Sequence, residues 1–189
     1  MSLTCFLSNQ HSIVGIADRR KYHMNPDKTM RSFSDDGSKL FKASDNFIIS
    51  KIGESTNLIN GFISKVIEEK FDFMQTVEVL QKFYDTFREQ LKQHICCING
   101  GGMVDGVSHL FASSTIGFKI RIYKGHDMAM LSGPPDYDPA EWLNPVFESG
   151  NHDLSSLMEM AKNLIKHAST ISKFVSPGYD LFCLGGEDK

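Results

Sequence analysis

The chain has 189 residues, 41% of them hydrophobic and 23% charged, a composition that predicts a single globular domain with a real core over residues 1–189. Its net charge of −3 and the lack of a basic run argue against a nucleic-acid partner. No apolar stretch approaches the length of a membrane span, and the N-terminus lacks the basic and apolar regions of a signal peptide.

The N-terminal stretch predicts a β-hairpin that ends in an acid. Residues 4–7 form the first strand, residues 8–11 supply turn chemistry, and residues 13–17 make a fully apolar second strand. This strand runs directly into Asp18, and burying an acid without a partner is costly. Asp18 is therefore either a residue that caps a turn or an acid with a partner elsewhere in the chain.

Residues 19–38 are polar and predict a surface loop or an irregular strand pair. The basic triplet at 19–21 is interpreted either as part of a solvated loop or as a rim that contacts substrate. In the second interpretation Arg20 and Tyr22 are the candidate contacts.

Residues 37–53 predict a second hairpin, with its turn at 43–46 and a helix after Gly53. Together the two hairpins resemble the proteasome-type N-terminal-nucleophile hydrolases, which include proteasome β-subunits and a simpler bacterial ATP-dependent protease ring. That family has a hairpin ending in Ala-Asp-x-Arg, a Lys-(Ile/Leu) strand, a hydrophobic strand, and a glycine that opens the first long helix. The corresponding residues here are 17–20, Lys39 with Leu40, 47–52, and Gly53, which follows Lys39 by 14 residues as the family pattern expects.

The resemblance extends further along the chain. Residues 175–184 are similar to the family's closing strand. Residues 19–38 are about five residues longer than the family pattern, which favours a surface insertion.

After Gly53 the apolar period changes from two to 3.6, which predicts two consecutive helices. Their apolar faces are Leu58, Ile59, Phe62, Ile63, Val66 and Ile67, and then Val77, Leu80, Phe83, Tyr84, Phe87 and Leu91. We interpret these residues as core packing against a layer of strands.

Four cysteines include the neighbours Cys96 and Cys97, which rarely pair with each other. Without a Cys-x-x-Cys or Cys/His ligand spacing, the sequence predicts buried thiols, no metal and no cofactor. A reducing cytoplasm is the simplest compartment for such a protein.

Asn99 with the glycines at 100–102, and Asp105 with Gly106, punctuate the middle of the chain. A phosphate-binding loop is not supported there, because no Lys-Ser/Thr follows the glycines and no GxGxxG exists. The remaining predicted elements are strands at 108–115, 117–124 and 128–131, a short helix around Trp142, a helix capped by Asp153 or Ser155, and a strand at 179–184.

This order of elements predicts an α+β domain. The resemblance implies in addition a four-layer αββα sandwich, in which two antiparallel sheets are flanked by helices.

The resemblance also implies an active site. In such a hydrolase the free α-amine of the first residue acts as base for its own hydroxyl, and a lysine fixed by a buried acid lowers the proton affinity of that hydroxyl. Lys39 would be the lysine, Asp18 the acid, and a backbone N–H at Gly53 the oxyanion donor. Ser132 is a partial match to a serine that the family places near the nucleophile, and Lys51 sits where the family lines its first specificity pocket. A positive pocket would favour acidic side chains, although a solvent-directed Lys51 is an equal alternative.

The nucleophile is ambiguous. Thr4 has the family's chemistry and is favoured, while Ser2 lies at the family's distance of 16 residues before Asp18. As written, Thr4 follows residues 1–3, so its nitrogen is an amide unless these residues are a removable leader or a cloning remnant. The third alternative is that no working nucleophile exists.

Further departures weaken the case for an enzyme. The family's Asp-x-x-Ser before its last strand corresponds here to Ser172 and Val175, which removes an acid. Two functions follow: a threonine-type peptidase or amidohydrolase that works as a homo-oligomer on peptide or amide substrates, or a catalytically inactive structural or assembly subunit. The resemblance also implies that the peptidase could have an unfoldase partner.

Overall fold

The computed structural model describes residues 2–25, 27, 30–148 and 152–185, so Met1 of the expected leader lies outside the description. All strand pairs are antiparallel and belong to three sheets. The first sheet has the order β10-β1-β2-β11, with β1 at Thr4–Ser8, β2 at Ser12–Asp18, β10 at Met128–Ser132 and β11 at Tyr179–Gly185. The second has the order β5-β6-β7-β8-β9, with β5 at Leu40–Ser44, β6 at Phe47–Gly53, β7 at Cys96–Val104, β8 at Val107–Ser114 and β9 at Ile120–Lys124.

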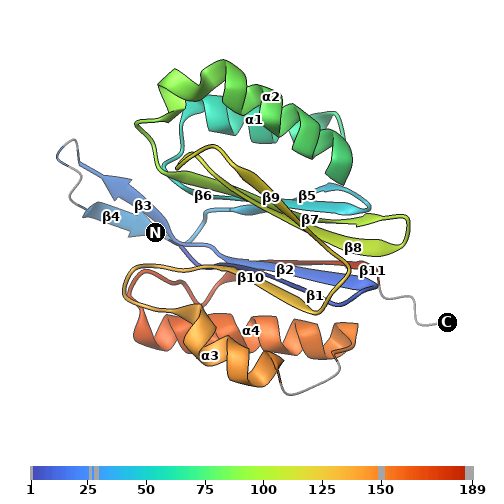
Figure 1. The fold of residues 1–189 in the computed structure, drawn as a ribbon. Helices are drawn as coiled ribbons and strands as arrows, with labels where there is room; N and C mark the ends of the chain where they lie inside the picture. The colour runs from blue at the N-terminus through green and yellow to red at the C-terminus, as the bar shows by residue number, and fades with distance from the viewer. Residues whose placement is uncertain (1, 26, 28–29, 149–151, 186–189) are drawn as a thin grey trace.

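Helices cover the outer faces of these two sheets. Figure 1 shows α1 (Asn57–Glu68) and α2 (Phe73–Leu91) over the five-stranded sheet, and α3 (Pro139–Phe147) and α4 (Leu154–Ile171) over the four-stranded sheet. The expected α+β class is confirmed by these mixed elements. None of the described helices is long and apolar enough to cross a lipid bilayer.

Local sequence explains where the helices begin. Thr56, Asp72, Asp138 and Asp153 each accept a hydrogen bond from a backbone N–H of the first turn, which otherwise lacks a partner. Of the two predicted caps for α4, Asp153 is the one used.

Three buried clusters fill the layers. One lies between α1, α2 and the five-stranded sheet, and one between α3, α4 and the four-stranded sheet. The third lies between the two sheets and contains Phe6, Ile13, Ala17, Leu40, Ile48, Leu110, Met130 and Leu184. Alternation along β1 therefore turns Phe6 toward the other sheet, while Cys5 and Leu7 face α4.

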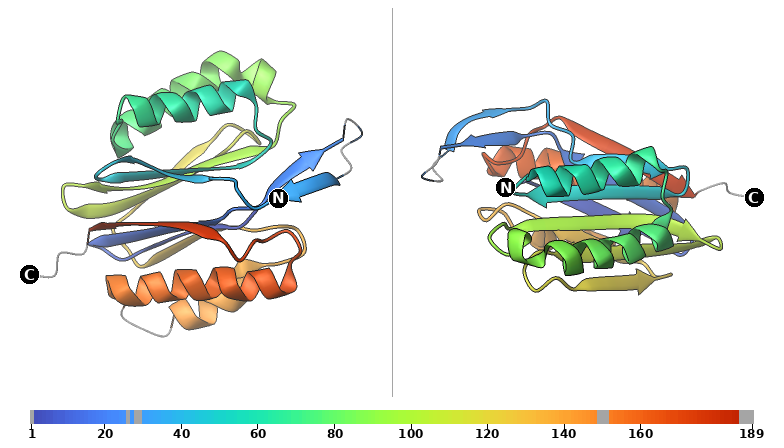
Figure 2. Two further views of the ribbon diagram at one scale, coloured as in Figure 1. Left: turned by 180° about the vertical axis from the view of Figure 1, so that it is seen from behind. Right: turned by 90° about the horizontal axis from the view of Figure 1, so that it is seen from above.

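The polar segment after β2 is a strand pair, the second of the two forms expected for it. β3 (Lys21–Met24) and β4 (Met30–Ser34) make a two-stranded sheet of their own. Figures 1 and 2 show this hairpin projecting from the end of the sandwich where β1 begins and β2 ends.

The glycines at 100–102 lie inside β7, a central strand, and do not separate two elements. Their absence of side chains makes room for rings: a Cβ at Gly100 would lie 2.5 Å from Phe111 and 2.9 Å from Phe47. Sequence reasoning took the glycines as breakers because the rings that fill the space come from β6 and β8.

Gly100→Ala is therefore expected to lower the free energy of unfolding by about 1–3 kcal/mol through overpacking. Gly61→Ala is the matched control, because Gly61 is exposed in α1 and a Cβ there would meet nothing within 4 Å. This control is expected to stabilise by about 0.5–1 kcal/mol. Denaturant unfolding of both variants measures the difference, and equal stabilities would contradict the packing described for β7.

Candidate active site

Two predicted residues from different hairpins meet at one end of the sandwich. Asp18 is the last residue of β2, and Lys39 directly precedes β5. Lys39 Nζ donates hydrogen bonds to Asp18 Oδ1 at 2.9 Å and to Asp18 Oδ2 at 2.8 Å. The Asp18 side chain is fully buried and that of Lys39 is 9% exposed, so this is an internal ion pair. Burial of the two charges is compensated only because they satisfy each other.

Three backbone N–H groups complete the surroundings of the carboxylate. Leu3 N–H donates to Oδ2 at 2.9 Å, Arg20 N–H donates to Oδ1 at 3.0 Å, and Ser176 N–H approaches Oδ1 at 3.5 Å. Asp18 therefore ties together the start of β1, the start of the hairpin β3–β4, and the segment before β11.

The charge of Lys39 is set by opposing effects. Burial lowers the pKa of Lys39, and the neighbouring Asp18 carboxylate acts to raise it. A lysine in this position is a fixed cation beside the N-terminal strand, where it can lower the proton affinity of a hydroxyl.

Thr4, the favoured nucleophile, is not hydrogen-bonded to Lys39. Its hydroxyl is buried and has no hydrogen-bond partner among the described residues, so it makes no hydrogen bond to Lys39. Thr4 lies inside β1, opposite Ala17 and Ser132. The residue of this strand that contacts the pair is Leu3, whose N–H belongs to the peptide bond that follows Ser2. Strand alternation places Ser2 on the same face of the sheet as Thr4, two residues nearer the N-terminus.

Gly53 closes β6 at the same end of the molecule. Its φ is +100°, and a Cβ there would collide with the Ile95 carbonyl oxygen, so only glycine fits. Lys51 N–H donates to Lys39 O, and Glu54 N–H donates to Ile95 O on the opposite edge. Alternation along the strand therefore turns the Gly53 N–H toward the edge on which Lys39 lies.

Ser132 ends β10 and stands opposite Thr4 in the strand register. Its hydroxyl accepts a hydrogen bond of 3.4 Å from Asn99 Nδ2, which reaches across from β7 in the other sheet. Asn99 was not among the predicted site residues.

Arg20 and Tyr22 contact the segment before β11. Arg20 Nη1 and the Tyr22 hydroxyl both donate to the Lys173 carbonyl oxygen, at 2.6 and 3.4 Å. The Arg20 guanidinium also binds both oxygens of Asp35, at 2.7 and 2.9 Å. Their contacts thus join the hairpin β3–β4 to the segment before β11.

Lys51 lies on the face of β6 that is turned toward α1. Its ammonium donates to Ser55 Oγ at 3.2 Å and contacts Asn60 Oδ1. Burial lowers the pKa of Lys51, and the positive charge of Lys21 acts in the same direction.

The segment before β11 contributes Ser176, which sequence reasoning missed. Ser172 and Val175 were matched to the family's acid and serine, but Ser172 donates to Asp136 at 2.7 Å, and Val175 is buried against α4. Ser176 is the residue whose N–H reaches Asp18. The sequence signal was the Ser-Pro-Gly at 176–178, which was interpreted as a loss of glycines.

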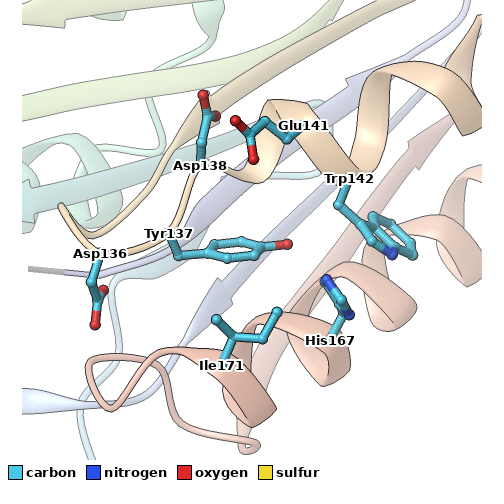
Figure 3. A pocket seen from close by; sticks show the side chains of 7 residues that line it. All are labelled: Asp136, Tyr137, Asp138, Glu141, Trp142, His167 and Ile171. Carbon is cyan, nitrogen blue, oxygen red and sulfur yellow. The ribbon is translucent and has the colours of Figure 1, made fainter.

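A cavity of about 360 Å³ lies elsewhere, between α4 and the loop that leads into α3. Figure 3 shows its lining of acidic and aromatic side chains, which are Asp136, Tyr137, Asp138, Glu141, Trp142, His167 and Ile171. None of the predicted site residues lines it. Within the described ranges, no group of three or more His, Cys, Asp or Glu side chains is arranged to hold a metal ion.

Comparison with solved structures identifies the fold. Eukaryotic HslV from Trypanosoma brucei matches with a TM-score of 0.68 and 13% identity, over 97% of this chain and 99% of that one. Anbu (ancestral beta-subunit) from Yersinia bercovieri matches with a TM-score of 0.67 and 14% identity, over 97% of this chain and 81% of that one. No protein-family model and no curated protein matches the sequence. The chain has a proteasome β-subunit-like fold.

Proposed function

We propose that the chain is an N-terminal-nucleophile amide hydrolase of the proteasome type, a peptidase, with Ser2 rather than Thr4 as its nucleophile. The observation that carries this proposal is the shared oxygen of Asp18, which accepts hydrogen bonds from Lys39 and from the N–H that follows Ser2. The proposal requires that Ser2 carries a free α-amine.

The chemistry follows from the positions of these groups. The Ser2 hydroxyl attacks the amide carbonyl while the α-amine, directly or through water, takes its proton, and the charge of Lys39 favours the developing alkoxide. The Gly53 N–H donates to the tetrahedral oxyanion. The amine product leaves with the proton, and water then hydrolyses the Ser2 ester to release the acid and restore the hydroxyl.

The proposed substrate is a peptide with an acidic side chain before the cleaved bond. Lys51 and Lys21 supply the positive charge that would attract it. Homo-oligomerisation, an unfoldase partner and a cytoplasmic location belong to the same proposal, and the fold shared with HslV and Anbu supports the first two.

A second candidate, an inactive structural or assembly subunit, is favoured by one observation. If Ser176 is the serine of the family's Asp-x-x-Ser, the residue three positions before it is Lys173 and not an acid.

Labelling of the nucleophile separates these candidates. A β-lactone that acylates hydroxyl nucleophiles is expected to add its mass to Ser2, and Ser2→Ala is expected to abolish both labelling and peptide hydrolysis. Thr4→Val is the matched control, because it replaces a buried hydroxyl that has no hydrogen-bond partner with an isosteric group. Peptide mapping by mass spectrometry, with the native N-terminus sequenced first, provides the measurement.

Labelling that persists in Ser2→Ala but disappears in Thr4→Val would restore Thr4 as the nucleophile. A wild-type chain with a free Ser2 amine that neither reacts nor hydrolyses peptides would favour the inactive subunit.

Lys51→Glu is expected to change the preference for the residue before the cleaved bond. The kcat/KM ratio for Glu against Lys substrates should fall by about fivefold, since an exposed ion pair contributes up to roughly 1 kcal/mol. Lys42→Glu is the control, because Lys42 lies on the neighbouring strand β5 and pairs with Asp45. An unchanged ratio in Lys51→Glu would remove Lys51 from the substrate site.

A further inference from the structure

The hairpin β3–β4 is anchored to the segment before β11 by polar and aromatic contacts. Arg20 and Tyr22 share the Lys173 carbonyl oxygen, and the rings of Tyr22 and Phe174 meet edge to face with centroids 5.5 Å apart. The Arg20 guanidinium also lies 4.3 Å from the centre of the Phe33 ring on β4. The hairpin lies in the segment 19–38, which the sequence predicts to carry a surface insertion.

Arg20 connects these contacts to the buried ion pair. Its backbone N–H donates to Asp18, while its side chain reaches Lys173 O and both oxygens of Asp35. The Arg20 side chain is only 13% exposed, whereas that of Asp35 is 39% exposed. A planar guanidinium held by two parallel hydrogen bonds has little freedom to rotate. Asp35 therefore fixes the direction of Arg20.

The same segment supplies the weakest donor to Asp18. Ser176 N–H lies 3.5 Å from Oδ1, and its position depends on a segment whose Lys173 carbonyl is held by Arg20. The pKa of Asp35 is lowered mainly by its hydrogen bonds from Arg20, with smaller contributions from the Ser176 hydroxyl and the charge of Lys39. Asp35 thus faces the site from the side that is open to solvent.

We propose that Asp35, acting through Arg20, is a positioning residue that holds the Asp18–Lys39 pair and the Ser176 segment in their working arrangement. Its catalytic consequence rests on the proposed function, but its effect on the ion pair does not. Asp35 contacts neither the nucleophile nor the substrate, so it acts only through its neighbours.

The electrostatic consequence has a definite sign. The charged groups that act on Lys39 are Asp18 from β2, Asp35 from the end of the hairpin, and Arg20. Burial lowers the pKa of Lys39, the two carboxylates raise it, and Arg20 lowers it. Asp35→Asn removes one carboxylate and leaves Arg20 without its counter-charge, so the pKa of Lys39 falls. Because the protonated lysine is the working form, activity is then lost at lower pH than in the wild type.

The experiment compares wild type, Asp35→Asn and Asp36→Asn. Asp36→Asn is the matched control, because Asp36 is the next residue in the chain. Among the described side chains, its carboxylate accepts a hydrogen bond from the Ser34 hydroxyl and not from Arg20. NMR titration of Lys39 is expected to show a lower pKa in Asp35→Asn and no change in Asp36→Asn. With a peptide substrate, kcat/KM of Asp35→Asn should fall about 10- to 100-fold and its alkaline limb should move to lower pH.

Arg20→Lys tests the mechanical link separately. It keeps the positive charge and the backbone N–H but loses the fork that binds Asp35 and Lys173 O together. It is expected to lower kcat with little change in KM, and to lower the thermal stability, because the Arg20 side chain is only 13% exposed and loses hydrogen bonds. Asp35 is more exposed, so Asp35→Asn is expected to keep its fold, and the Lys39 titration in that variant decides the inference.

A Lys39 titration that is identical in wild type and Asp35→Asn overturns this inference. A wild type without turnover would overturn the proposed function instead, and the Lys39 titration would still decide whether Asp35 holds the pair.

Discussion

The buried ion pair between Asp18 and Lys39 is the constraint on which the rest of this end of the molecule depends. Removing two charges from water is unfavourable by several kcal/mol for each ion unless their partners are well placed. Here one ammonium and three backbone N–H groups converge on a carboxylate with no exposed surface. A pair of this kind restricts the positions of the segments around it, because displacing any one of them would leave the buried carboxylate without one of its hydrogen-bond donors.

Those segments come from distant parts of the chain, and each is held by its own element. β1 and β2 supply the N-terminal strand and the acid, β5 follows the lysine, and the residues before β11 supply the last donor. Gly53 joins them from the end of β6, where a positive φ ends the strand and turns the chain toward α1. The fold therefore brings the Asp18–Lys39 pair, the start of β1 and the end of β6 to one end of the sandwich.

Much of this arrangement was accessible from the sequence. Short local patterns predicted both hairpins, the four helices and the pairing of Asp18 with Lys39. These patterns are apolar strands that end in a charged residue, helix caps, and a glycine before a helix. The glycines of β7 were misjudged because the rings that replace their side chains belong to β6 and β8. Arg20 and Tyr22 also bind the carbonyl oxygen of Lys173, about 150 positions away, and nothing in the local sequence reveals this contact.

The strand order of the four-stranded sheet has a consequence for assembly. β1 and β2 are its inner strands, yet their outer neighbours, β10 and β11, come from the second half of the chain. During synthesis the hairpin of β1 and β2 therefore emerges first, and its two outer edges stay unpaired until β10 and β11 have been made. Long-range pairing of this kind is slow to form. The Asp18 carboxylate can acquire its full set of donors only when the segment before β11 docks, so the ion pair is completed only after the second half of the chain is in place.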